Sequence, residues 1–187
     1  MTNDRRRYIE GAIFFLGFCL TIPAANWMIG HVGTACAPQG PCLVPVAPGL
    51  MAPSGVLMIG AALVLRDLVQ RRLGFEMSVA AILAGAALSM MLAPVSLVTA
   101  STAAFLLSEF ADLFVYTPLQ RRRLVAAVVL SSLAGLVVDS IVFLYLAFGS
   151  LQFLAGQIIG KSWMVLLSIP LIMWLRRRDA RIGLEAA

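Results

Sequence analysis

The sequence is poor in charged residues, which make up only 12% of its 187 residues. Soluble domains carry about 25%, so this composition excludes an ordinary water-soluble enzyme. It also excludes a disordered chain, because disorder requires low hydrophobicity and high net charge. Apolar residues account for 61% of the chain, and a membrane-spanning helix needs about 20 of them. We therefore expect an α-helical membrane protein whose function lies within its helix bundle.

The sequence also lacks residues that many sites require. It has one histidine, His31, and no Cys-x-x-Cys pair, so it predicts no zinc site, no bis-histidine haem site and no other cofactor. It has no Gly-x-x-x-x-Gly-Lys-Ser/Thr loop, which excludes ATP hydrolysis by that route. A serine hydrolase would need a histidine within the membrane. We therefore expect no catalytic residues and no enzymatic activity.

Long apolar segments account for most of the chain. Each is bounded by proline, glycine or arginine, and none shows the alternation in units of about ten residues that strands of a barrel require. They predict one transmembrane domain over residues 1–187, built as a bundle of six helices. The predicted helices are residues 9–29, 50–70, 77–93, 95–118, 124–148 and 151–175, with a loop at 31–49.

The basic residues predict the orientation of these helices. All but Lys161 lie in clusters beside the apolar segments: Arg5–Arg7, Arg66, Arg71–Arg72, Arg121–Arg123, Arg176–Arg178 and Arg181. The positive-inside rule places such clusters in the cytoplasm, so both termini are expected there and the loop 31–49 outside. The net charge of +5 does not predict a nucleic-acid partner, because such a partner would need a continuous basic face.

The external loop contains two of the three cysteines. Cys36 and Cys42 flank Gly40–Pro41, a pair that favours a turn between them. An oxidising outer compartment would permit a disulfide, and the alternative is two free thiols in a loop stiffened by proline. Cys19 lies in the middle of the first helix and is expected to pack.

Four ionisable residues stand out because they lie well inside predicted membrane segments, where a charge costs about 2.5–3.5 kcal/mol and usually faces a cavity or the bundle interior. They are Glu109, Asp112, Asp139 and Lys161. One interpretation is that Lys161 neutralises carboxylates to hold the bundle together. However, three carboxylates face one ammonium, so the surplus must be protonated or paired with a ligand.

Polar residues at helical spacing continue from these four and form a stripe on each of three helices. Such stripes at middle depth occur where transporters place their binding sites. We expect Asp112, Asp139 and Lys161 to converge on one central cavity, with Asp112 in contact with the substrate. The stripes comprise Ser101, Phe105, Ser108, Glu109, Asp112 and Tyr116; Ser132, Gly135 and Asp139; and Gln157, Lys161, Met164 and Ser168.

Other polar positions are open to two interpretations. Arg66 and Asp67 are expected at the cytoplasmic end of the second helix, either as a functional pair or as a snorkelling arginine with an adjacent acid. Asn26, followed by Trp27, is either functional or part of an interfacial anchor. Glu10 is expected to be solvated. Gly156 and Gly160 have the spacing of a helix-packing motif.

From about Ile22 to Leu175, the sequence resembles the VUT family of queuosine precursor transporters, the YhhQ-like group of bacterial inner-membrane proteins. Each of the matching motifs is weak alone, but they follow in the expected order on the expected segments. They are Asn26–Trp27; Arg66-Asp67-Leu68 with Arg71 and Gly74; Ala100–Ser101; Glu109-Phe110-Ala111-Asp112 with Val115–Tyr116; Asp139–Ser140 with Phe143 and Ala147–Phe148; and Lys161.

The resemblance implies a six-helix fold similar to the substrate-binding subunits of vitamin importers, in a multi-pass protein of the bacterial inner membrane. It also implies uptake of a 7-deazaguanine precursor for tRNA modification. Five positions carry over by motif match as substrate-binding candidates, to which the polar stripes add Glu109 and Gln157. The five are Asn26, Asp67, Asp112, Asp139 and Lys161.

The chemistry of these residues suits a guanine-like base. A carboxylate can accept hydrogen bonds from the ring N–H and the adjacent amine together, while Lys161 or Gln157 could donate to the carbonyl. Phe105, Tyr116 and Trp163 could stack on the ring or simply pack. The expected partners are this small molecule and membrane lipid, and a homodimer is the favoured oligomer.

Three hypotheses about function follow from the sequence. The chain is a carrier that acts alone, a substrate-binding subunit for a vitamin-like solute that needs a separate ATPase, or an intramembrane enzyme or assembly factor. The first is favoured because the polar stripes predict a binding site, whereas Asp112 and Asp139 lack the sequence context of an aspartyl protease.

Overall fold

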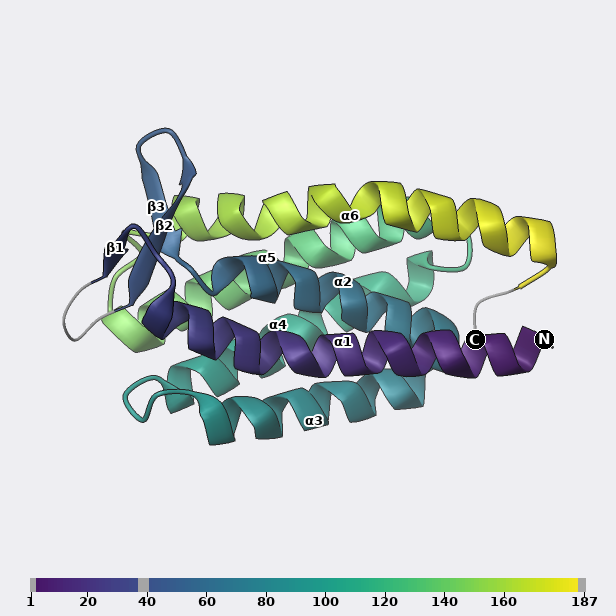
Figure 1. The fold of residues 1–187 in the computed structure, drawn as a ribbon, viewed down its shortest axis with the longest axis horizontal. Helices are drawn as coiled ribbons and strands as arrows, with labels where there is room; N and C mark the ends of the chain where they lie inside the picture. The colour runs from purple at the N-terminus through teal and green to yellow at the C-terminus, as the bar shows by residue number, and fades with distance from the viewer. Residues whose placement is uncertain (1–2, 37–40, 185–187) are drawn as a thin grey trace.

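The computed structural model describes residues 3–36 and 41–184, which form six helices and a small sheet (Figure 1). The helices run side by side along the long axis of the molecule, and the strands lie together at one end. The helices are α1 (Asn3–His31), α2 (Val56–Leu73), α3 (Phe75–Leu92), α4 (Val98–Leu119), α5 (Leu124–Phe148) and α6 (Leu154–Ile182). The strands are β1 (Ala35–Cys36), β2 (Cys42–Ala47) and β3 (Leu50–Pro53).

The two ends of the bundle differ. The first turn of α1 meets the last turn of α6, where Asn3 Nδ2 donates to the Ile182 carbonyl oxygen at 3.2 Å. The α2–α3 and α4–α5 connections lie at this same end, whereas the sheet and the other connections lie at the opposite end (Figure 1). We call these the basic end and the sheet end, because the arginine clusters that flank the helices are at the former.

The outer surface of the bundle suits lipid. Every helix except α2 is long and apolar enough to cross a membrane. Large apolar side chains such as Leu16, Phe114 and Leu167 are more than half exposed. Large exposed apolar surfaces mark regions that contact a membrane or another protein. No side chain of α2 is among the large exposed apolar residues in the described part of the chain.

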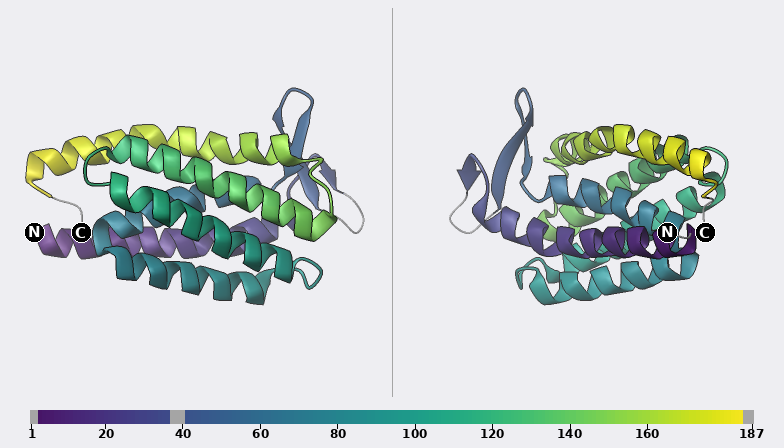
Figure 2. Two further views of the ribbon diagram at one scale, coloured as in Figure 1. Left: turned by 180° about the vertical axis from the view of Figure 1, so that it is seen from behind. Right: turned by 45° about the vertical axis from the view of Figure 1, so that its right-hand side comes forward.

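Helix α2 forms the centre of the bundle. It contacts each of the other five helices, and it separates α6 from α3, which lie on opposite sides (Figure 2). Its four charged residues, Arg66, Asp67, Arg71 and Arg72, are all buried. The one helix that is not long and apolar enough by itself to cross a membrane is therefore the one most shielded from lipid.

The predicted start of the second helix, at residue 50, was wrong. Residues 50–53 form β3, which pairs antiparallel with β2 after a tight turn in which Gly49 has a φ of +73°. Pro53 closes this edge strand, a position that tolerates the missing N–H of proline, and α2 begins only at Val56. The last helix also differs from the prediction, because it extends from Leu154 to Ile182.

Small residues bring α2 and α6 into close contact. A Cβ added at Gly60 would lie 2.5 Å from the main-chain oxygen of Lys161, and one added at Gly160 would lie 2.6 Å from the Val56 side chain. The prediction that Gly156 and Gly160 serve packing is consistent with this arrangement, since Gly156 lies against the Met51 carbonyl. The close approach places the Lys161 side chain inside the bundle, where it is only 1% exposed.

Candidate substrate-binding site

A cavity lies in the half of the bundle nearer the sheet end. All six helices contribute to its wall, together with Pro53 and Gly55. Its empty volume is about 610 Å³, counting the space that opens to solvent at its mouth. Most of the wall is apolar, and its polar side chains are Asn26, Ser89, Ser101, Asp139, Gln157 and Lys161. Mostly apolar walls with a few polar groups are typical of small-molecule sites.

Lys161 and Asp139 form the charged part of the cavity wall. Lys161 Nζ donates to Asp139 Oδ2 at 2.6 Å, to Ser140 Oγ at 2.8 Å, and to Gln157 Oε1. These three bonds occupy all three donors of the ammonium group. The Asp139 side chain is 10% exposed whereas that of Lys161 is 1% exposed, so the carboxylate is the more accessible charge.

The two oxygens of Asp139 differ in their partners. Oδ2 accepts from Lys161, whereas no hydrogen bond from the described part of the chain reaches Oδ1. A carboxylate oxygen has two acceptor positions, so both oxygens retain capacity for a ligand. Lys161 thus orients Asp139 and compensates its charge, leaving the carboxylate as the principal acceptor in the wall.

A second buried cluster lies deeper in the bundle, around Arg66. Its guanidinium group contacts three carboxylates: Asp67 at 2.9 Å, Glu109 at 3.2 Å, and Asp112. Arg66 Nη1 also donates to Gln70 Oε1 at 3.0 Å, and the Tyr116 ring lies 5.6 Å from the guanidinium carbon. No member of this cluster lines the cavity.

The predicted site residues therefore fall into two groups. Asn26, Gln157, Asp139 and Lys161 line the cavity, as do Ser101 and Phe105 of the stripe on α4. Asp67, Glu109 and Asp112 lie with Arg66 instead. The expectation that Asp112 shares one cavity with Asp139 and Lys161 is not met, because Arg66 attracts Asp112 to the centre of the bundle.

The aromatic candidates are also separated. Phe105 lines the cavity and lies 6.0 Å from Phe18, measured between ring centroids. Tyr116 belongs to the Arg66 cluster. Trp163 is 48% exposed, and its Nε1 donates to the Val46 carbonyl oxygen at 2.8 Å. Of the three predicted stacking residues, only Phe105 could contact a ligand in the cavity.

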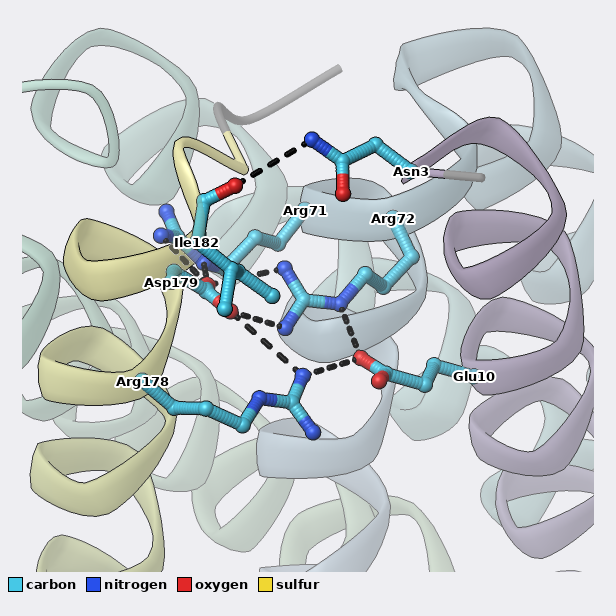
Figure 3. Close-up of polar contacts among 7 residues, drawn as sticks. All are labelled: Asn3, Glu10, Arg71, Arg72, Arg178, Asp179 and Ile182. Atoms are coloured by element: carbon cyan, nitrogen blue, oxygen red, sulfur yellow. Dashed lines mark hydrogen bonds and ion pairs between the residues drawn. The ribbon is translucent and has the colours of Figure 1, made fainter. Parts of the chain in front are cut away.

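A network of ion pairs links α1, α2 and α6 at the basic end (Figure 3). Asp179 accepts hydrogen bonds from Arg71 and Arg72 at 2.8–3.2 Å, and its side chain is 2% exposed. Glu10 pairs with Arg72 at 2.9 Å and Arg178 at 2.6 Å. The expectation that Glu10 is solvated was wrong, because two arginines of neighbouring helices bring it into this network.

Of the two interpretations of Arg66, the snorkelling arginine is wrong, because its side chain is fully buried near the middle of α2. The sequence contains an indication of this position, because Arg66 and Gln70 are four residues apart and Asp67 and Gln70 three apart, so all three polar side chains can lie on one side of the helix.

At the sheet end, Cys36 and Cys42 are opposed in the β1–β2 pair and form a disulfide.

One comparison with known proteins finds a family to which part of the chain is similar. Residues 89–175 match the family model described as "putative vitamin uptake transporter", and this range holds Asp139, Lys161, Glu109 and Asp112. No curated protein matches the chain. No solved structure matches it either. Residues 89–175 are therefore similar to this family of uptake transporters, and the match together with five helices long and apolar enough to cross a membrane indicates a multi-pass membrane protein.

Proposed function

We propose that this chain imports a queuosine precursor, a 7-deazaguanine derivative used in tRNA modification, across the bacterial inner membrane. The observation that carries the proposal is the cavity, in which Asp139 is held by buried Lys161 opposite a mostly apolar wall. The family match supports transport of a vitamin-like solute. The resemblance of the sequence to queuosine precursor transporters supplies the substrate.

The cavity suits a guanine-like base in three respects. The Asp139 carboxylate can accept from a ring N–H and the neighbouring amine as charge-assisted bonds. The amide of Asn26 and the hydroxyl of Ser101 line the same wall and offer donors for a ring carbonyl. Phe105 supplies an aromatic face beside them. An aminomethyl group on the base would carry a positive charge attracted to the carboxylate.

We further propose six membrane spans with both termini in the cytoplasm. Helix α2 counts as the sixth span, since it lies inside the bundle and contacts the other five helices. The basic end would face the cytoplasm by the positive-inside rule, and the cavity near the sheet end would then open to the outside. This orientation suits uptake.

Reporter fusions test the orientation. Fusions after Gly74 and after Leu119 should give a cytoplasmic signal, because both positions follow helices that end at the basic end. A fusion after Ala47, in the sheet, should give an external signal. A cytoplasmic signal in the sheet together with external signals at the other two positions would reverse the proposed orientation.

An uptake assay in cells tests the substrate. In a host that can neither make the precursor nor import it, expression of this chain should restore queuosine in tRNA when precursor is supplied at low concentration. A chain that reaches the membrane but restores none would contradict the assignment. Restoration that depends on a co-expressed ATPase would instead identify a substrate-binding subunit.

A further inference from the structure

The two buried clusters differ in charge balance. Lys161 and Asp139 are one cation and one carboxylate, so the wall of the cavity is balanced. In the Arg66 cluster, one guanidinium faces three carboxyl groups whose side chains are at most 2% exposed. The second cluster therefore holds more carboxyl groups than its one cation can balance. An uncompensated charge in such surroundings is very unfavourable, so we expect a carboxyl group of this cluster to bind a proton.

Asp67 and Asp112 approach each other within this cluster. One oxygen of each contacts the same guanidinium nitrogen, Arg66 Nη2, so the two carboxyl groups converge on one point inside the bundle. An ionised carboxylate can only accept hydrogen bonds. A hydrogen bond between two carboxyl groups therefore requires a proton on one of them.

Unpartnered atoms give a second, independent indication. Asp112 Oδ2 and the Tyr116 hydroxyl are buried and have no hydrogen-bond partner in the described part of the chain, and Asp67 Oδ1 has an ion-pair contact with Arg66 Nη2 but no hydrogen bond. Both aspartate side chains are 0% exposed. Buried polar atoms are rarely left unpaired, and a proton held between the carboxyl groups would satisfy both acceptors.

We propose that Asp67 and Asp112 share one proton and form a proton-binding site, whose proton is coupled to substrate uptake. Binding of the proton follows from the geometry alone, whereas the coupling rests on the proposed function. A metal ion is the wrong ligand, because the Arg66 guanidinium already places a positive charge in contact with both carboxyl groups. No group of three or more metal-binding side chains occurs in the described residues.

Other polar and charged groups face Asp67 and Asp112 and influence how tightly the two aspartates bind a proton. Arg66 faces them from α2, Glu109 and Tyr116 face them from α4, and α5 contributes the Ser131 hydroxyl, which donates to Asp67 Oδ2 at 3.0 Å.

The pair lies between the cavity and the network at the basic end. Asp67 is eight residues from the cavity residue Ile59 along α2, about 12 Å at 1.5 Å per residue, and four residues from Arg71. On α4, Glu109 follows the cavity residue Phe105 by one helical turn and accepts from Arg66 Nε at 3.2 Å. A ligand that displaces Phe105 can therefore alter the contacts of Arg66 with Asp67 and Asp112. Coupling between two binding sites is reciprocal, so if the ligand changes the proton affinity of the two aspartates, the proton changes the ligand affinity by the same factor.

Infrared spectroscopy of the purified full-length chain tests the proton site without any substrate. A protonated carboxyl group gives a carbonyl stretching band that shifts on transfer from H₂O to D₂O. We expect this band at neutral pH, and we expect Asp67→Asn and Asp112→Asn each to remove it, since the remaining aspartate would then ionise beside Arg66. Glu109→Gln is the matched control and should retain the band.

Isotope labelling provides a measurement that needs no variant, in case the substitutions prevent folding. Carbon-13 at the side-chain carboxyl of aspartate should shift the band of the wild-type chain, whereas the same label in glutamate should not. Absence of the band, or a band that shifts only with labelled glutamate, would overturn the proton site.

The coupling is tested separately in proteoliposomes, with 7-aminomethyl-7-deazaguanine as the probe. For one proton per substrate, an inward gradient of one pH unit should raise accumulation about tenfold. Uptake that ignores the gradient would overturn the coupling. If the infrared band is present and the probe is not taken up even without a gradient, the substrate assignment fails while the proton site stands.

Discussion

Asp139→Asn should reduce the affinity for a guanine-like ligand at least about 100-fold, because it replaces one carboxylate oxygen with an amide donor. Hydrogen bonds to a charged group contribute about 1.5–3 kcal/mol each, and each 1.4 kcal/mol corresponds to a factor of ten. Asp139 is the accessible carboxylate of the cavity. Ligand binding to the purified protein is the measurement, with 7-aminomethyl-7-deazaguanine as the titrant.

A control must separate binding from folding, because Asp139→Asn also leaves the buried Lys161 ammonium without its counter-ion. Removing one partner of a buried pair costs about 3–5 kcal/mol, whereas replacing both with uncharged groups is often neutral. The double variant Asp139→Asn with Lys161→Met should therefore regain the thermal stability that the single variant loses. It should still fail to bind.

Ser140→Ala provides a second control from the same helix. It removes one hydrogen bond to Lys161 Nζ but keeps the ion pair with Asp139, so affinity should change by only a few-fold. Normal affinity of the Asp139→Asn variant, or recovery of binding in the double variant, would exclude Asp139 as a ligand contact and move the binding site out of this cavity.

The polar stripes were predictable because helical spacing fixes which side chains share a face. Five of the six residues of the α4 stripe are buried, and Ser101 is half-buried; the five are Phe105, Ser108, Glu109, Asp112 and Tyr116. The stripe on α5 is buried in the same way, and Gln157 and Lys161 are buried on α6. Spacing of three or four residues, together with the high cost of a charge facing lipid, was sufficient to orient these helices.

The depth of the cavity was not predictable from that spacing. Phe105 lines the cavity, whereas Glu109 and Asp112, one and two turns further along the same face, lie below it. A polar stripe shows which side of a helix faces the bundle interior. It does not show at which depth packed side chains form the floor of the cavity. That depth depends on Arg66, which comes from another helix and fills the space next to these carboxylates.

The position of Arg66 was missed because the start of α2 was misplaced by six residues. With a helix from residue 50, Arg66 lies near the membrane surface, where a snorkelling arginine is ordinary. With α2 beginning at Val56, Arg66 lies past the middle of an 18-residue helix that contacts all the others. Hydropathy could not distinguish the strand Leu50–Pro53 from a first helical turn, because both are apolar.

Asp179→Ala should produce the largest loss of stability among substitutions at the basic end. The Asp179 carboxylate accepts two hydrogen bonds from Arg71 and two from Arg72. Its removal leaves buried guanidinium groups that no longer have their main counter-ion, which costs about 3–5 kcal/mol. The temperature of half-unfolding of the purified protein in detergent is the measurement, and it should fall markedly.

Two further variants show how the loss of stability depends on the burial of the side chain and on the number of its ion-pair partners. Glu10→Gln should lower the unfolding temperature less, because the Glu10 side chain is 16% exposed and Arg72 retains Asp179. Arg176→Ala, at an exposed position one turn before the network on the same helix, should have almost no effect, as is usual for exposed charges. Equal effects of Asp179→Ala and Arg176→Ala would show that the network adds nothing to stability. The expected order instead means that these buried ion pairs hold α1, α2 and α6 together at the basic end.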